Sequence, residues 1–421
     1  MILFDARKPL VMLAGFSAAL MATGLVRAST NCSSLPGTIV YGAGGSAQLP
    51  LLAEVGTQLA NLASPISIVY SDSGSACAGY SDLVTPTAIS GTAFYWTGNG
   101  TTSSCALDLG GDPVTFAVMG NAPNLCSGVT GLAAGFGQFL GPVQPVDFVV
   151  PVQSSQQSIS TEAAYYVWGF GASSSSLSVN PWSATADIFT RSASSFVNVF
   201  VALDTGVPAA TVALSGVVES TNSATVSALA ALNGTSSAEA GIGFVSGEVA
   251  DGNRSSIRTL AYQHTGQTCG YWPDSTVTAF DKINVRDGQY WLWSPVHFYA
   301  AVGSTGAISD AATASLLGYI TGSVAPPAGF DPFTAAFSAY AVPQCAMHAW
   351  RDGDLAPLYS YSPPVSCSCQ FDIASSNTGK PASCKTCTEN SDCTAQASHC
   401  RNIGPPLGAD SGPNVGYCEV N

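Results

Sequence analysis

Three short turns rich in glycine and serine contain the residues of this chain best suited to bind an anion. They cover residues 42–46, 73–77 and 191–195, and each joins an apolar, strand-like run to a helix-like run. The first turn of a helix has backbone N–H groups without intrahelical partners, and the helix dipole places partial positive charge there. Arg191 adds a fixed positive charge with planar donors to the third turn. Together the turns predict a site for a small oxyanion.

The predicted contacts with this oxyanion are one guanidinium, several hydroxyl groups and two backbone amides. We expect Arg191 to donate to two oxygens of the ligand in a bidentate arrangement. The other predicted contacts are the hydroxyl groups of Ser75, Ser194 and Ser195 and the backbone amides of Ser46 and Ala47. A single glycine-rich turn is often purely structural, so the prediction depends on all three turns meeting at one point.

The sequence lacks the usual short signatures of metal, nucleotide or hydrolase chemistry. The chain has no H-E-x-x-H spacing, no Gly-Lys-Ser/Thr loop and no Gly-x-Ser-x-Gly elbow. We therefore expect no metal, no cofactor and no enzymatic activity, and we place His297, which lies in an apolar run, in the core. A Ser/His/Asp hydrolase site assembled from distant segments stays open as an alternative.

Strand-like and helix-like runs alternate over the first 340 residues, which is typical of an α/β protein with a mostly parallel sheet. Apolar runs predict buried strands at 38–41, 66–70, 114–119 and 240–246, and helical spacing predicts a helix at 46–61. The proline-bracketed run 145–151 and the run 283–302 predict two crossings between lobes. We expect lobe 1 to comprise residues 29–146 with 284–362, and lobe 2 to comprise residues 147–283.

The C-terminal segment, residues 363–421, is predicted to be a small disulfide-rich module. It has little apolar content and contains seven of the 13 cysteines of the chain, so covalent links would have to hold its shape. Its cysteines are Cys367, Cys369, Cys384, Cys387, Cys393, Cys400 and Cys418. Zinc held by some of these cysteines and His399 is the alternative, but export favours disulfides.

Two further disulfides are predicted in the rest of the chain. We expect Cys105 to pair with Cys126, and Cys269 to pair with Cys345. Because the number of cysteines is odd, one must stay unpaired within the chain, and we expect it to be Cys32.

The first 28 residues have the pattern of a secretory signal peptide. Arg7 and Lys8 precede an apolar stretch, and residues 26–28 provide a cleavage site after Ala28. An uncleaved membrane anchor is the alternative. We therefore expect the protein in the periplasm or outside the cell.

The chain is acidic, with a formal net charge of −14, although only 9% of its residues are charged. This charge argues against nucleic acid and anionic membranes as partners. It does not exclude a small anion, because a desolvated site responds mainly to its nearest neighbours.

In their order along the chain, the turns resemble those of the phosphate-binding receptors of ABC importers, within the two-lobed periplasmic binding proteins of type II fold. The resemblance covers residues 38–340. Its four motifs are Gly42–Ser46, Gly74-Ser75, Val114–Pro123 and Arg191–Asn198. The chain departs from the family in two places: Asn121 replaces an anion-binding Asp, and Phe196-Val197 replaces Gly-Thr.

The resemblance implies a monomeric, non-enzymatic receptor that closes two α/β lobes around a small oxyanion and passes it to an ABC permease. Phosphate is the ligand that it favours. It also implies a ligand contact at Asn121, whose side chain can donate or accept a hydrogen bond. The alternative is an envelope or extracellular interaction protein with this fold and a degenerate ligand site, which the two departures and the C-terminal module favour.

Overall fold

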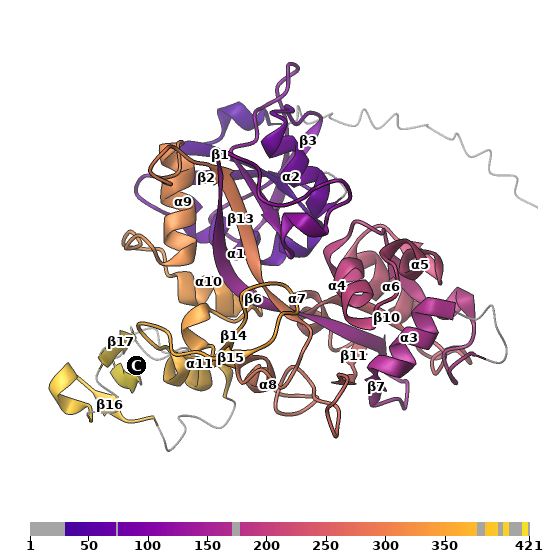
Figure 1. Ribbon diagram of the computed structural model, residues 1–421. Coiled ribbons are helices and arrows are strands. Elements are labelled where there is room, and N and C mark those ends of the chain that lie inside the picture. The colour runs from indigo at the N-terminus through magenta and orange to yellow at the C-terminus, as the bar shows by residue number, and fades with distance from the viewer. Residues whose placement is uncertain are drawn as a thin grey trace, which may run out of the picture.

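The computed structural model describes residues 30–72, 75–170, 177–376, 384–394, 399–403 and 415–419. The predicted signal peptide lies outside these residues. Figure 1 shows two α/β lobes and a smaller C-terminal part below the first of them. We call them lobe 1, which contains β1–β5, lobe 2, which contains α3–α7, and the C-terminal module, which contains α11 and β16–β18. The expected two-lobed α/β fold is confirmed.

A single nine-stranded sheet runs through both lobes, in the order β10-β6-β13-β5-β1-β2-β3-β4, with β11 paired to β6. In lobe 1, β1 pairs in parallel with β2 and β5, as the alternating pattern predicted. The other six pairings of this sheet are antiparallel, so the prediction of a mostly parallel sheet is wrong: β6 and β13 run against their neighbours, and β3 runs against both β2 and β4. The strands are β1 (Thr38–Gly44), β2 (Ile66–Ser71), β3 (Thr92–Trp96), β4 (Thr102–Ala106), β5 (Phe116–Met119), β6 (Phe136–Pro151), β10 (Gly243–Ser246), β11 (Ile257–Thr259) and β13 (Trp293–Ala301).

Strand β6 connects the lobes directly. Its first part pairs with β13 in lobe 1, and its last part pairs with β10 and β11 in lobe 2. Residues from Gly141 to Pro151 are all buried, which explains the nearly continuous apolar sequence of this segment. The predicted crossing at 145–151 therefore lies within one long strand.

Helices cover both lobes because their apolar residues recur at helical spacing. In α1, Leu51, Leu52, Val55 and Leu59 are buried against the sheet of lobe 1. The helices of lobe 1 are α1 (Leu49–Ala60), α2 (Ala76–Val84), α9 (Ala311–Thr321) and α10 (Pro332–Ser338). Those of lobe 2 are α3 (Thr161–Phe170), α4 (Phe196–Thr205), α5 (Ala209–Leu214), α6 (Asn222–Ala231) and α7 (Gly247–Gly252), and α8 (Ile283–Arg286) precedes β13.

Short strand pairs complete lobe 2 and the segment that leads to the module. In lobe 2, β7 (Ser158–Ser160) pairs with β12 (Ala261–Gln263), and β8 (Phe189–Arg191) pairs with β9 (Val217–Glu219). Beyond α10, β14 (Ala349–Trp350) pairs with β15 (Tyr359–Ser360). The β8–β9 pair matters for function, because it carries Arg191 at its end.

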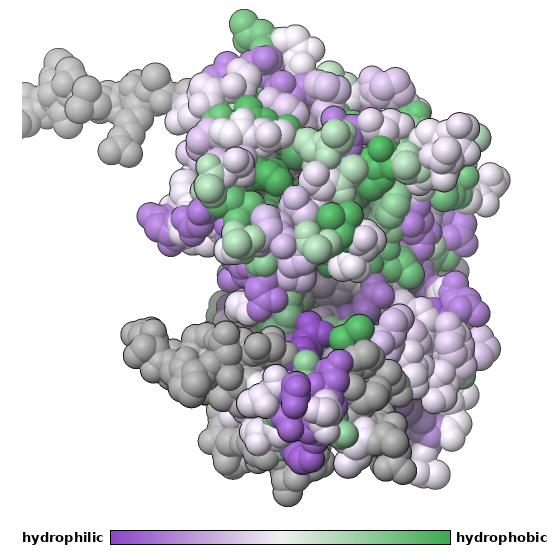
Figure 2. Space-filling model, turned by 90° about the vertical axis from the view of Figure 1, so that its left-hand side faces the viewer, coloured by the Kyte–Doolittle hydropathy of each residue, from purple (hydrophilic) through white to green (hydrophobic). Residues whose placement is uncertain are grey.

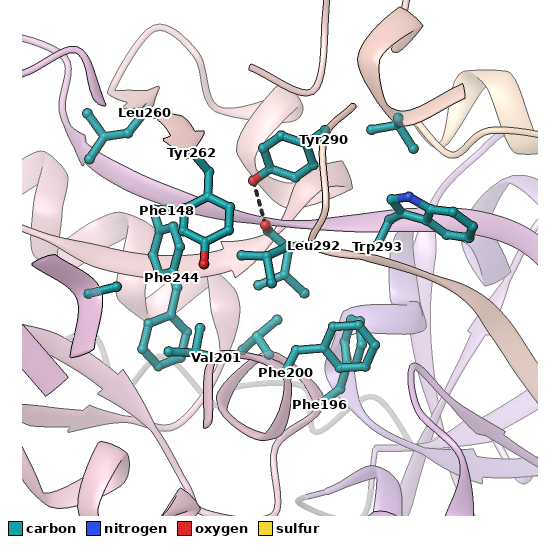
Figure 3. Packing of buried hydrophobic residues seen from close by; sticks show 14 of the residues in the cluster. Phe148, Phe196, Phe200, Val201, Phe244, Leu260, Tyr262, Tyr290, Leu292 and Trp293 are labelled. Carbon is teal, nitrogen blue, oxygen red and sulfur yellow. Dashed lines mark hydrogen bonds between the residues drawn. The ribbon is translucent and has the colours of Figure 1, made fainter. Parts of the chain in front are cut away.

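Aromatic side chains form the core of lobe 2 (Figure 3). Phe148 of β6 stacks on Trp168 of α3, with ring centroids 5.0 Å apart. The hydroxyl of Tyr290 donates to the carbonyl oxygen of Val146 at 2.7 Å. This bond satisfies a buried hydroxyl and fixes the segment before β13 against β6.

The C-terminal module combines α11 (Ser368–Ser375) with a three-stranded sheet of β16 (Thr386–Cys387), β18 (Val415–Glu419) and β17 (His399–Ile403). Phe371 of α11 packs on Phe333 and Phe337 of α10, and Arg286 forms an ion pair with Asp372 at 2.5 Å. Helix α11 of the module thus packs into the same hydrophobic core as α10. On the face in Figure 2, the surface is hollowed between lobe 1 and the module, where a groove of about 600 Å³ lies.

The disulfides differ from two of the predicted pairs. Cys105 pairs with Cys32, and Cys126 pairs with Cys77; the prediction of Cys105 with Cys126 is wrong because the two residues lie in different core clusters. The prediction that Cys32 is free is also wrong.

The predicted disulfide between Cys269 and Cys345 is also wrong, because Cys345 lies beside the start of α11. Cys345 pairs with Cys367, and Cys269 is an exposed free cysteine. All seven cysteines of the module are in disulfides, as predicted, and its other pairs are Cys369–Cys384, Cys387–Cys400 and Cys393–Cys418. None of the helices in the described part of the chain combines the length and apolar character that a bilayer span needs.

Candidate anion-binding site

A pocket of about 340 Å³ lies between the two lobes. Lobe 1 lines it with Gly45, Ser46, Ala47, Gln48, Asp72, Ser75 and Ala76, and lobe 2 with Arg191, Ser195, Phe196, Ser220, Thr221 and Asn222. We call it the anion pocket. The structure therefore brings five of the predicted residues together: Ser46, Ala47, Ser75, Arg191 and Ser195.

Four helices begin at this pocket. They are the short 3₁₀ helix Ser46–Gln48 that continues into α1, and the helices α2, α4 and α6. Ser75 and Thr221 cap their helices by accepting from the amides of Ala78 and Ala224, at 3.1 and 3.0 Å. At Gly45 and Ser195, no side chain caps the helix. Several first-turn amides are therefore left to face an anion.

Close packing at the end of β1 fixes the position of the first turn and of the start of α2. A side chain at Gly79 of α2 would place its Cβ 2.4 Å from the backbone nitrogen of Gly44, so only glycine allows α2 to approach β1 this closely. The hydroxyl of Tyr70 donates to the carbonyl oxygen of Gly45 at 2.9 Å. These contacts hold Ser46 and Ser75 on one wall of the pocket.

Arg191 lies at the end of β8 and is only 4% exposed. Its Nε donates to the carbonyl oxygen of Glu219 at 3.0 Å, its Nη1 to Asn222 Oδ1 at 2.8 Å and its Nη2 to the carbonyl oxygen of Ser220 at 2.9 Å. These bonds use three of its five N–H donors and hold the guanidinium against the start of α6.

The guanidinium remains a cation despite its burial. Burial lowers the pKa of Arg191 to about 10, and the charge of Glu219 opposes the shift. The pocket therefore contains a fixed positive charge at neutral pH, with low exposure to water that would screen it.

Three features of the pocket were missed from the sequence. The start of α6, residues 220–222, carries the same Ser/Thr/Asn signature as the predicted turns and could have been found from it. Gln48 is 1% exposed, and its Oε1 has no hydrogen-bond partner in the described structure. Asp72 adds a carboxylate, and burial raises its pKa.

Two predicted contacts, Asn121 and Ser194, do not line the pocket. Asn121 is fully buried behind the end of β5, where its Nδ2 donates to the carbonyl oxygen of Ala122 at 2.9 Å. The ring of Phe196 packs on Gly120 so closely that a Cβ there would lie 2.3 Å from it. Phe196 thus occupies the space beside the third motif. Ser194 precedes the N-cap residue Ser195 and is exposed.

The zinc alternative for the module meets an obstacle in the disulfides. The sulfur atoms of Cys387, Cys393 and Cys418 lie within 4.8 Å of one another, but each belongs to a disulfide. A metal-binding cysteine must be a thiolate, so this cluster is two disulfides packed together.

His297 lies in the core, as predicted, within a buried set of Ser, His and Asp side chains. Its Nε2 is 3.2 Å from Ser294 Oγ and 3.5 Å from Asp354 Oδ1. Its Nδ1 has no hydrogen-bond partner in the described part of the chain. A catalytic triad needs the serine and the carboxylate on opposite ring nitrogens. Here both lie at Nε2, so this set does not have the hydrogen-bond arrangement of a hydrolase triad.

A second set of Ser, His and Asp side chains, at the start of α11, has the hydrogen-bond arrangement of a triad. His348 Nε2 is 2.8 Å from Ser368 Oγ, and its Nδ1 is 2.6 Å from Asp287 Oδ1. However, the next two amides, of Cys369 and Gln370, both donate to the carboxylate of Glu419 at 3.0 Å. Amides held in this way are not available to stabilise an oxyanion during acyl transfer.

Sequence searches match no protein-family model and no curated protein. Solved structures similar to this chain include one described as a phosphate ABC transporter substrate-binding protein with bound phosphate from Clostridium perfringens. It is 10% identical with a TM-score of 0.49, over 73% of this chain and 99% of that chain.

Two further similar structures are described as a phosphate transport receptor and as a regulatory domain. An ABC-type phosphate transport receptor from Vibrio cholerae is 12% identical, with a TM-score of 0.42 over 72% of this chain and 99% of that one. The OxyR regulatory domain from Pseudomonas aeruginosa is 11% identical, with a TM-score of 0.35 over 69% and 98%. At these scores and identities, the similarities do not decide the ligand.

Proposed function

We propose that this protein is an exported, non-enzymatic binding protein for a small oxyanion, with phosphate as the favoured ligand. The observation that carries the proposal is the convergence of four helix starts and the Arg191 guanidinium on one pocket between the lobes. Unpaired amides, hydroxyl groups and a buried cation are the groups that bind oxyanions without a metal.

Phosphate fits the anion pocket better than sulfate because of Asp72. A carboxylate repels a fully deprotonated oxyanion but accepts a hydrogen bond from one that still carries a proton. Phosphate carries such a proton near neutral pH, and sulfate does not. The half-buried Asp72 thus supports selection by protonation state.

The volume of the pocket supports a movement of the lobes on binding. About 340 Å³ exceeds the volume of one small ion, since a water molecule takes about 30 Å³. We expect the lobes to close on the ligand around β6 and the segment leading to β13, as in hinged binding proteins. The ligand would then be passed to an ABC permease by a monomeric receptor in the periplasm or outside the cell.

A matched pair of serines tests the proposal. Ser195 lines the pocket with no side-chain cap to lose, whereas Ser194 does not line it. In calorimetric titrations with phosphate, we expect Ser195→Ala to weaken binding roughly tenfold to a hundredfold, as for a lost hydrogen bond to a charged group. We expect Ser194→Ala to bind like the unmodified protein.

The same titration decides between the proposal and its alternative. If the folded, unmodified protein binds neither phosphate nor related oxyanions, the proposal is wrong. The alternative, an envelope or extracellular interaction protein with a degenerate site, would then be favoured. Phe196 beside Gly120 and the disulfide-linked module are the features that support this alternative.

A further inference from the structure

A second cavity of about 350 Å³ opens beside the anion pocket. The two share four lining residues, Ser46, Asp72, Thr221 and Asn222, so they are neighbouring parts of one space between the lobes. We call the second cavity the side compartment. A ligand held in the anion pocket could extend into it without crossing a wall of protein.

The walls of the side compartment are mainly apolar. Leu49, Pro50 and Ala53 of the first turns of α1, Phe94 and Trp96 of β3 and Val249 of α7 line it. Trp96 donates its indole N–H to Thr102 Oγ1 at 3.1 Å, so its polar atom is already satisfied. Its ring therefore offers apolar surface to a ligand.

The charge of the side compartment excludes a second anionic group. Asp72 is the only charged residue among those that line it in the described structure, and no lysine or arginine is present there. A second phosphate would meet a carboxylate with no cation to compensate it. An uncharged, apolar group would instead remove apolar surface from water at no electrostatic cost.

We propose that the ligands of this protein include oxyanions with an apolar substituent, namely phosphonates or phosphate monoesters. The monoanionic head, which keeps one proton to donate to Asp72, binds at the helix starts and Arg191, and the substituent binds between Trp96, Phe94 and the start of α1. This inference rests on the proposed function, because it assigns the head to the anion pocket.

Two phosphonates with the same head test the inference. Methylphosphonate and phenylphosphonate are titrated calorimetrically, with inorganic phosphate as reference, at a pH below the second pKa of both phosphonates, at which each head keeps one proton. We expect phenylphosphonate to bind about tenfold more tightly than methylphosphonate, because burial of the ring removes apolar area from water.

A pair of variants on α1 locates the substituent. Ala53 lines the side compartment and Ala60 does not, although both are partly exposed on the same helix. We expect Ala53→Leu to fill the compartment and reduce the preference for phenylphosphonate to less than about threefold, with phosphate affinity unchanged. We expect Ala60→Leu to keep the full preference.

Each other outcome overturns the inference in a distinguishable way. Phosphate binding with equal affinities for the two phosphonates would refute the substituent site and leave the proposed function standing. A preference that Ala53→Leu and Ala60→Leu reduce equally, or not at all, would show that the ring binds elsewhere. Absence of binding by phosphate and both phosphonates would refute the proposed function, and the inference with it.

Discussion

The start of α11 and the four helix starts at the anion pocket differ in what their first-turn amides bind. At α11, the chain supplies its own anion: Glu419 accepts hydrogen bonds from the amides of Cys369 and Gln370 and is only 1% exposed. In the anion pocket, four helices begin and two of them have no side-chain cap. A helix start that is needed only for stability is closed by an internal carboxylate, whereas the starts in the cleft are left open for an external anion.

The largest expected effect that would test this comparison comes from Arg191→Ala. The change removes the buried cation of the pocket, and we expect phosphate binding to weaken by roughly a hundredfold or more, about 3 kcal/mol. Calorimetry measures the affinity, and circular dichroism checks that the variant is folded.

Arg191→Lys is the second variant of this test. It keeps the charge but loses the planar donors that hold residues 219–222, so we expect an intermediate affinity. If folded Arg191→Ala bound phosphate with unchanged affinity, Arg191 would not contribute to binding. Phosphate would then bind to the open helix starts without this cation, or at a different site.

A smaller effect is expected from Glu419→Gln. Burial raises the pKa of this carboxyl group, while the amides of Cys369 and Gln370 favour its charged form. Glutamine has one acceptor oxygen in place of two, so one helix amide loses its partner. We expect the free energy of unfolding to fall by about 2 kcal/mol, measured by denaturant titration, with phosphate affinity unchanged.

The control for this change is Glu162→Gln in the exposed first turn of α3. We expect it to lower the free energy of unfolding by less than about 1 kcal/mol. If Glu419→Gln weakened phosphate binding, the start of α11 and the helix starts of the anion pocket would be coupled, and the comparison between them would fail.

The smallest effect is expected from Asp72→Asn, and it concerns selectivity. Without the carboxylate, sulfate is no longer repelled, so we expect the preference for phosphate over sulfate to fall about tenfold. In the unmodified protein, sulfate affinity should rise as the pH falls through the raised pKa of Asp72, because protonation neutralises this group. In the variant, this rise should be absent. A preference that does not change would assign the selection to another group.

The sequence predicted the elements better than the contacts between them. Local patterns of apolar, glycine and serine residues predict the parallel strands β1, β2 and β5, the crossing within β6 and the turns at Ser46, Ser75 and Arg191. They do not predict the antiparallel pairing of the other strands, which depends on where distant strands such as β13 insert. The choice between Ser194 and Ser195 could not be made, because it depends on which of two adjacent residues is the N-cap of α4.

Long-range packing explains the other errors. Asn121 is absent from the pocket because Phe196, more than 70 residues later, covers the end of β5, and no local pattern reveals this contact. The pairing of Cys32 with Cys105 is equally invisible, since spacing alone does not determine disulfide connectivity. Asp72 could have been considered, because it adjoins the second predicted turn.

The position of β13 in the sheet has a consequence for the order in which the protein can fold. This strand lies between β6 and β5, although it begins about 140 residues after β6 ends. Until it arrives, the facing edges of β5 and β6 have no partner, and unpaired edges can associate with other chains. The elements of lobe 2 are contiguous in the chain between β6 and β13, so lobe 2 is free to form first. Lobe 1 would need protection from association with other chains until β13 is available to pair.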